Sequence, residues 1–174
     1  MATLRRIGAT EPVILDVQCS LAATYESLGR HESALQMKGD VYSGRLRIHG
    51  EEHERTLSAG NNYAASLIAL KRYAEIKSLL RKMMPVARRV LGESDQLALK
   101  MRFGYARALY KDKGATLGDL REAVTTLEDT ERTARRVLGG AHPTTTGIEA
   151  ELRRARADLR AREAPPTTQA KSQN

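Results

Sequence analysis

Apolar residues recur along this chain at steps of three and four residues, which is the spacing of one buried helical face. Polar or glycine-containing stretches, such as SLGRHESA and LKRYAE, interrupt the pattern and divide it into segments of helical length. The pattern therefore predicts helices in successive pairs, followed by one last helix. The apolar positions of the first helix in each pair, and then of the last helix, are Leu15, Leu21, Ala22, Tyr25 and Leu28; Leu57, Ala64, Leu67 and Leu70; Leu99, Ala106 and Leu109; and Ile148, Leu152, Ala155 and Leu159.

Glycines show that these pairs are repeats. Gly8, Gly50, Gly92 and Gly139 each follow a basic and apolar stretch and precede a short polar segment, with spacings of 42, 42 and 47 residues. Glycine is common just after a helix because it adopts a left-handed conformation without steric penalty. The longer third spacing indicates an expanded inner turn, YKDKGATLGDLREAV, which includes Gly118 and holds about five extra residues.

The repeat gives a domain organisation for an all-α chain. Each hairpin exposes an apolar face until a neighbour stacks on it, so the hairpins should form one array with a shared core. The opening segment, TLRRIG, is similar to the last turn of a helix, and the closing APPTTQAKSQN is polar and rich in proline. We predict a remnant of a preceding helix and turn at 1–12, hairpins at 13–50, 54–92 and 95–139, a capping helix at 143–163, and a disordered tail at 164–174.

One short stretch could suggest catalysis. His49, Glu52 and His53 follow the order H-x-x-E-H, which occurs in a class of zinc peptidases. Such a site needs both histidines on one helical face, whereas Gly50 lies between them at the repeat boundary. The stretch is therefore interpreted as a linker, and we predict no metal site and no cofactor. The sequence also lacks a Gly-rich phosphate loop and a nucleophile elbow, so we expect no enzyme.

Composition adds charge and location. The chain has 174 residues with 29 basic and 21 acidic side chains, a net charge of +8, and only 4% aromatic residues. The excess of positive charge would attract acidic peptides, nucleic acid or an anionic surface. No apolar run is long enough to span a membrane and no secretory signal follows the first arginines. The lone Cys19 cannot form an internal disulfide, which favours a reducing, cytoplasmic location.

The inner turn and the 42-residue period resemble those of a known family. YESLGRHESAL, with Ala22, Tyr25, Gly29 and Ala34, resembles the turn of the tetratricopeptide (TPR) repeat. RRVLGGAHPTTT, HERTLSAGNNYAASL and LKRYAE are similar to the repeats of kinesin light chains and their relatives. The resemblance implies a right-handed α-solenoid of about three antiparallel hairpins with a capping helix. No heptad segment for pairing with a motor heavy chain is present, so attachment to kinesin heavy chain is not predicted.

The resemblance also implies a function. In TPR arrays the first helix of each hairpin lines a concave groove that binds a peptide or a partner helix. Aligning the first helices places polar, basic and aromatic side chains in that groove, where arginine can bind a carboxylate and an asparagine amide can bind peptide backbone. We therefore predict a non-catalytic interaction module, similar to an adaptor or cargo-binding scaffold, for an acidic partner. Its predicted peptide-binding residues are Asn61, Asn62, Lys100, Phe103, Arg107, Tyr110 and Lys111.

Two alternatives remain. The last helix is rich in arginine and could bind nucleic acid or an anionic surface through phosphate contacts. Acidic residues are interleaved with these arginines, and no aromatic residue lies nearby, so a polar capping helix is favoured and nucleic acid is not the expected partner. The chain could also be a fragment of a larger TPR protein with no independent function. The arginines concerned are Arg153, Arg154, Arg156, Arg160 and Arg162, interleaved with Glu149, Glu151, Asp158 and Glu163.

Overall fold

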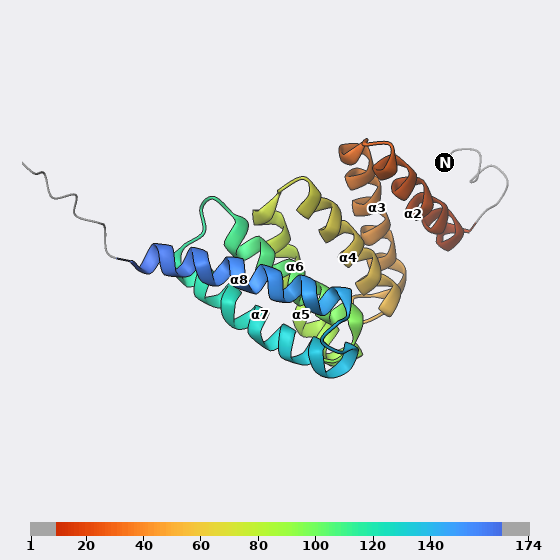
Figure 1. Ribbon diagram of the computed structural model, residues 1–174. Coiled ribbons are helices and arrows are strands. Elements are labelled where there is room, and N and C mark those ends of the chain that lie inside the picture. Colours follow the sequence, from red (N-terminus) through yellow and green to blue (C-terminus); the bar gives the residue numbers. More distant parts are fainter. Residues whose placement is uncertain (1–9, 165–174) are drawn as a thin grey trace, which may run out of the picture.

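The computed structural model describes residues 10–164, and these residues form seven helices and no strand (Figure 1). The predicted remnant at 1–12 and tail at 164–174 fall almost entirely outside the described residues. Successive helices pack in antiparallel pairs, so the predicted all-α solenoid of three hairpins and a last helix is confirmed. The helices are α2 (Glu11–Ser27), α3 (His31–His49), α4 (Glu54–Ala69), α5 (Tyr73–Leu91), α6 (Gln96–Lys111), α7 (Leu117–Leu138) and α8 (Pro143–Glu163).

Glycines end the second helix of each hairpin, as their spacing predicts. Gly50, Gly92 and Gly139 have φ angles of +80°, +83° and +88°. Their ψ angles of 175°, 164° and 158° differ from the ordinary left-handed conformation expected from sequence. This backbone region is populated essentially by glycine alone. A side chain at any of these three positions would therefore strain the turn that connects one hairpin to the next.

Polar side chains start the helices that follow. Asp95 accepts hydrogen bonds from the backbone N–H groups of Leu97 and Ala98 at the start of α6. Thr116 and Asp119 form a reciprocal capping box at the start of α7. These side chains satisfy backbone donors that have no partner within the helix. The starts of α6 and α7 are therefore encoded locally in the linkers that precede them.

The five extra residues of the third repeat are divided between a linker and a helix. The inner linker is 112–116, two residues longer than 28–30 and 70–72. Helix α7 has 22 residues, whereas α3 and α5 have 19 each. Gly118, expected in the turn, lies in the first turn of α7. The expansion is therefore smaller in the loop than the sequence suggests, because the capping box starts the helix early.

One continuous core runs through the array from α3 to α8. Its fully buried side chains are mostly leucine and alanine, and Leu67, Leu80 and Leu109 are at most 1% exposed. Each helix packs against the next in sequence, and the first helices also meet, α4 with α6 and α6 with α8. Small residues permit the close approach: a Cβ on Gly104 of α6 would lie 3.3 Å from Ile68 Cδ1 of α4. This contact between first helices creates the surface on which the candidate site lies.

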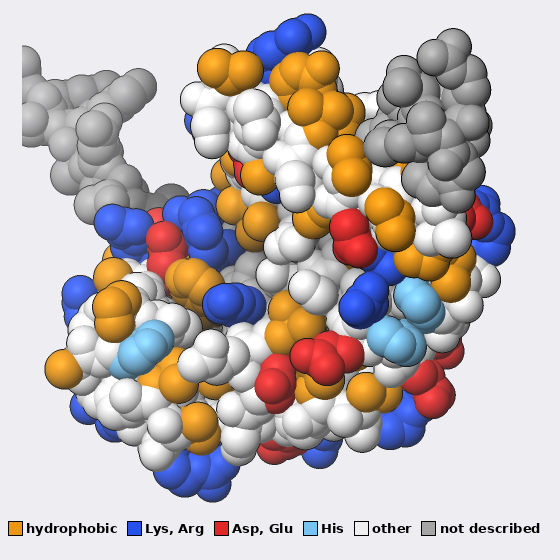
Figure 2. Space-filling model, turned by 90° about the vertical axis from the view of Figure 1, so that its right-hand side faces the viewer, with side chains coloured by type: hydrophobic (Ala, Val, Ile, Leu, Met, Phe, Trp, Pro, Cys, Tyr) orange, Lys and Arg blue, Asp and Glu red, His pale blue; other side chains and the backbone are white. Residues whose placement is uncertain are grey.

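Helix α2 carries an apolar stripe on its outer side. Val13, Val17 and Leu21 recur at four-residue steps and are 48%, 40% and 36% exposed. In the space-filling view of this end of the molecule, hydrophobic side chains follow the length of the helix (Figure 2). The equivalent positions one repeat later, Ala59 and Tyr63 on α4, are buried or half-buried beside α3. The stripe is therefore the face on which, later in the array, the second helix of the preceding hairpin packs.

Candidate functional site

The predicted binding residues lie on two neighbouring first helices, α4 and α6. Asn61 and Asn62 are half-buried on α4. On α6, Lys100 is exposed, and Phe103, Arg107 and Lys111 are partly exposed. The fifth residue on α6, Tyr110, is only 7% exposed and belongs to the core. The structure thus exposes four of the five predicted α6 side chains along one face of the helix.

A carboxylate on α8 brings the basic residues together. Glu151 is 8% exposed, and its Oε1 atom accepts a hydrogen bond of 3.1 Å from Lys111 Nζ. Arg154 Nη1 donates a second hydrogen bond of 3.1 Å to the same oxygen. Arg107 Nε lies 3.8 Å from Glu151 Oε1. We call Arg107, Lys111 and Arg154, grouped around Glu151, the cationic cluster.

The cationic cluster is not neutral. One carboxylate faces three cations, and the buried Nε of Arg107 and Oε2 of Glu151 have no hydrogen-bond partner among the described residues. Burial, together with repulsion from Arg107 and Arg154, lowers the pKa of the Lys111 ammonium group. The same repulsion that disfavours the charged form of Lys111 favours an additional anion beside it. The cluster therefore has an excess of positive charge that favours a second carboxylate, and one of its donors, the buried Arg107 Nε, is unused.

Aromatic rings adjoin this cluster. The Arg107 guanidinium carbon lies 5.6 Å from the centre of the Phe103 ring, and Lys111 Nζ lies 5.5 Å from the centre of the Tyr110 ring. Phe103 packs one side against the core and leaves the rest of its ring accessible. The hydroxyl of Tyr110 is buried, and no group within residues 10–164 forms a hydrogen bond with it. Phe103 can therefore contact a ligand, whereas Tyr110 supports the surface from below.

Helix α4 provides the other side of the surface. Ala65 and Ala69 are exposed, and Ile68 is half-buried against α6. Asn61 and Asn62 lie one turn earlier on the helix, beside α6 in the array and apart from the hydrogen bonds of Glu151. The structure thus places the asparagines on the helix beside the cationic cluster and not within it.

Two residues of the cluster, Glu151 and Arg154, are not among the binding residues predicted from the sequence. The sequence shows them only as part of the charge pattern of the last helix. A usable signal existed, because Glu151 precedes Leu152 of the apolar stripe and so lies at the border of the buried face. Which neighbour that border meets depends on how α8 packs on α6, and periodicity alone does not determine this.

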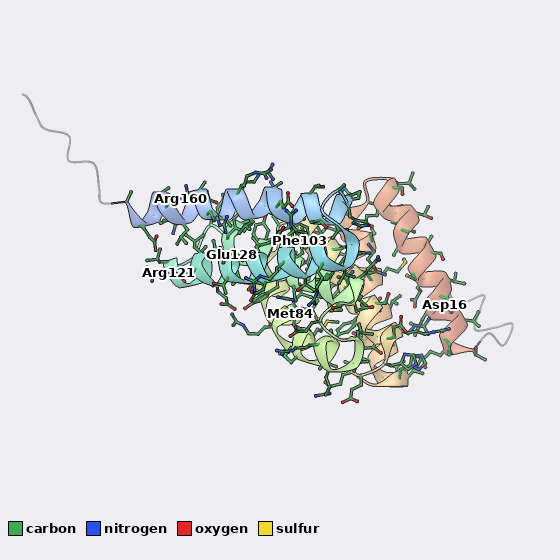
Figure 3. All side chains as sticks on the ribbon, turned by 60° about the horizontal axis from the view of Figure 1, so that its bottom comes forward. Asp16, Met84, Phe103, Arg121, Glu128 and Arg160 are labelled. Atoms are coloured by element: carbon green, nitrogen blue, oxygen red, sulfur yellow. The ribbon has the colours of Figure 1, made fainter. Side chains whose placement is uncertain are left out.

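Two of the other four arginines of α8 are engaged with the protein. Arg156 donates a hydrogen bond of 2.7 Å to Glu128 of α7, and the Arg162 side chain donates to the Ala115 carbonyl oxygen. At the end of α8, Glu163 accepts hydrogen bonds from Arg121. Figure 3 labels Arg121 on α7. These contacts attach α8 to α7 and to the linker that precedes α7. They support a capping role for the helix, whereas the exposed Arg153 and Arg160 form no side-chain hydrogen bond or ion pair within residues 10–164.

The H-x-x-E-H stretch forms a linker. Helix α3 ends at His49, and His53 caps α4 by accepting a hydrogen bond from the Arg55 backbone N–H. The two imidazole rings nevertheless stack, with centroids 4.4 Å apart. Glu52 pairs instead with Arg89 of α5. Residues 10–164 contain no cluster of three or more His, Cys, Asp or Glu side chains that could hold a metal ion.

Hollows on the surface also occur away from the cluster. One is lined by α3, α4 and α5, with Tyr42, Met83 and Val86 among its side chains. Another lies between α5 and α7 and includes Met84 and Arg102. Both lie along the second helices of the hairpins. The cationic cluster, by contrast, belongs to the side formed by the first helices.

Comparison with known proteins identifies the repeats. The family model described as Tetratricopeptide repeat matches residues 14–55 and 56–96. A variant of a Podosopora anserina putative kinesin light chain with nearly identical TPR-like repeats has a TM-score of 0.74 at 23% identity over 86% of this chain and 68% of its own. A second structure of those repeats has a TM-score of 0.73 at 24% identity over 84% and 67%. BtubC (BKLC) from P. vanneervenii has a TM-score of 0.56 at 14% identity over 95% and 70%.

These matches define the class of protein. Residues 14–96 are tetratricopeptide repeats, and the fold of the chain is that of the kinesin-light-chain-like repeat structures. The resemblance found in the sequence is thereby confirmed for the repeat and for the fold. Tetratricopeptide repeats form interaction scaffolds, so the fold supports binding of another protein.

Comparison with curated protein sequences finds no match. Among the described residues, no helix has the length and apolar character needed to cross a bilayer.

Proposed function

We propose that this chain is a protein-interaction module that binds an acidic peptide, or the acidic face of a partner helix, along α4, α6 and α8. The observation that carries the proposal is the convergence of Arg107, Lys111 and Arg154 on the single carboxylate of Glu151. Such an excess of cations on a partly buried surface attracts carboxylates more strongly than exposed, separate lysines would. Catalysis and attachment to a motor form no part of the proposal.

Each part of the surface has a role in this binding mode. Arg107 can bind a carboxylate with two parallel hydrogen bonds, and Lys100, two turns earlier on α6, adds an exposed charge. The exposed part of the Phe103 ring can pack against an apolar or aromatic side chain of the ligand. Asn61 and Asn62 can hydrogen-bond to the backbone of an extended peptide. Together these groups suit a ligand that combines carboxylates with one bulky side chain.

The proposal is tested by direct binding of defined probes. Fluorescence anisotropy would compare a labelled peptide of about eight residues that has several glutamates and one tryptophan with the same peptide carrying glutamines. The wild-type chain is expected to bind the glutamate peptide, and the double variant Lys100→Glu, Arg107→Glu is expected to lose at least about tenfold in affinity. Circular dichroism would first establish that the variant is folded.

A matched control separates a local site from general attraction. Lys82→Glu, Arg132→Glu makes the same charge change on exposed side chains of α5 and α7. Its affinity should fall by less than about twofold in about 0.15 M salt, where distant surface charges are screened. Equal losses in the two double variants, or equal binding of the glutamine peptide, would reject the groove. Tighter binding of a labelled single-stranded oligonucleotide, with a steep salt dependence, would favour nucleic acid instead.

A further inference from the structure

Glu151 contacts the cations that would bind a ligand carboxylate in the proposed function. It is buried on α8, yet it faces α6 and accepts hydrogen bonds from Lys111 and Arg154, at 3.1 Å each. Burying a carboxylate is costly unless cations and hydrogen bonds compensate for its lost hydration. Here the compensation comes from Lys111 and Arg154, which in the proposed function bind the carboxylate of the ligand.

The carboxylate of Glu151 does not use all the donors of the cationic cluster, so a second carboxylate could compete with it for them. Both hydrogen bonds reach the Oε1 atom, whereas Oε2 lies 3.1 Å from Lys111 Nζ as an ion pair without hydrogen-bond geometry. The buried Nε of Arg107 has no hydrogen-bond partner within residues 10–164, since it remains 3.8 Å from Glu151. An internal carboxylate thus engages part of the donor set and leaves part unused. An external carboxylate that binds Arg107 would also draw on Lys111 and Arg154.

We infer that Glu151 determines the specificity of this surface as an internal competitor of the acidic ligand. It lowers the affinity for any single carboxylate, because such a ligand must share donors that Glu151 already holds. A ligand with several neighbouring carboxylates offsets this competition by engaging Lys100 and Arg107 at the same time. The surface therefore selects clustered acidic residues over isolated ones. The inference rests on the proposed function and concerns the same site.

A purely structural role for Glu151 makes a different prediction. If its only task were to attach α8 to α6, replacing it would change the stability of the fold and leave the preference among ligands unaltered. The competitor role requires a change in that preference. The ratio of affinities for two ligands, measured on the same folded variant, therefore distinguishes the two roles.

The test uses two labelled probes of equal length, one with a cluster of glutamates and one with a single glutamate, each with one tryptophan. The wild-type chain should bind the clustered probe much more tightly than the single-glutamate probe. Glu151→Gln keeps the shape of the side chain and one acceptor oxygen. It should raise the affinity for the single-glutamate probe by about tenfold, which corresponds to about 1.4 kcal/mol. The affinity for the clustered probe should rise less, so that the ratio of the two affinities falls.

The control variant, Glu149→Gln, makes the same charge change two residues before Glu151. Glu149 lies on α8 as well, but it pairs with Arg135 of α7 instead of the cationic cluster. Glu149→Gln should alter both affinities by less than about twofold in about 0.15 M salt. A gain equal to that of Glu151→Gln would show long-range electrostatics in place of competition and would overturn the inference.

A second variant keeps the experiment decisive if Glu151→Gln unfolds. Glu151→Asp retains the negative charge but shortens the side chain by one methylene group, so that it holds Lys111 and Arg154 less well. Competition predicts a smaller gain of about threefold for the single-glutamate probe, whereas a simple charge effect predicts none. Folded variants that bind both probes as the wild type does would overturn the inference and leave the proposed function intact. Failure of wild type and variants to bind either probe would instead reject the proposed function.

Discussion

Lys38 of α3 and Glu26 of α2 form an ion pair at the junction of the first two hairpins, with Nζ 2.7 Å from Oε2. Lys38 is 9% exposed, and its ammonium group also donates a hydrogen bond of 2.9 Å to Ser66 Oγ on α4. Ser66 in turn donates to the other Glu26 oxygen, at 2.7 Å. Three helices therefore meet in one closed polar network, and a buried lysine holds α2 in place.

Replacing Lys38 should loosen the N-terminal end of the array. Lys38→Met keeps the apolar stem but leaves Glu26 and Ser66 without their shared donor, and removing one member of a buried ion pair is strongly destabilising. Because Glu26 is partly exposed and water can reach it, we expect a loss of about 2 kcal/mol and a fall in Tm of about 4–8 °C. Differential scanning calorimetry would measure it. Lys82→Met, on an exposed side chain of α5, should change stability by less than about 0.5 kcal/mol.

The same network predicts a dependence of stability on acid pH. Burial raises the pKa of Glu26, but hydrogen bonds from Lys38 and Ser66 and the charge of Lys38 together lower the pKa below 4.5. The folded state thus binds fewer protons than the unfolded state, and the stabilisation is present above the unfolded pKa and lost as pH falls through the folded value. Urea unfolding of wild type and Glu26→Gln would show a stability difference that shrinks from about pH 6 to about pH 3. A constant difference over that range would contradict this origin of the stability.

The fold could be predicted because its signals are local and repeated. Each linker between hairpins has a glycine at a fixed offset, and each first helix shows the same apolar stripe, so the copies of one pattern support each other. The site was less predictable. Residues Lys100, Phe103, Arg107 and Tyr110 share a broad helical face in projection, but α6 packs against both α7 and α8. That packing buries Tyr110 and introduces Glu151, and neither result is visible in the sequence of α6.

Two glycines should respond to alanine with opposite signs. Gly92 has φ +83° and ψ 164°, a conformation strained for any side chain, so Gly92→Ala should cost about 1–3 kcal/mol. Gly147 lies inside α8, and no described atom that would obstruct a Cβ lies within 4 Å of its position. Gly147→Ala should therefore stabilise the protein by about 0.5–1 kcal/mol, because alanine loses less backbone entropy in a helix. Thermal unfolding of the two variants checks both signs, and a stabilising Gly92→Ala would contradict the assigned linker geometry.

Removing the hydroxyl group should also change stability differently at two tyrosines of α6, Tyr105 and Tyr110. Tyr105 is 2% exposed, and its hydroxyl donates to Glu122 at 2.7 Å and accepts from Arg81 Nη2 at 3.0 Å. Tyr105→Phe should therefore cost about 1 kcal/mol. The Tyr110 hydroxyl is buried without a partner in the part of the chain that the structure describes, and removing an unsatisfied polar group relieves its desolvation cost.

Tyr110→Phe should accordingly be neutral or stabilising, by up to about 1 kcal/mol, in chemical unfolding experiments. The variant should also bind the clustered glutamate peptide as the wild type does, since the ring supports Lys111 from the core and the hydroxyl lies away from solvent. A loss of peptide affinity with unchanged stability would place the Tyr110 hydroxyl in the binding surface after all. A large loss of stability would instead reveal a hydrogen-bond partner for it in solution.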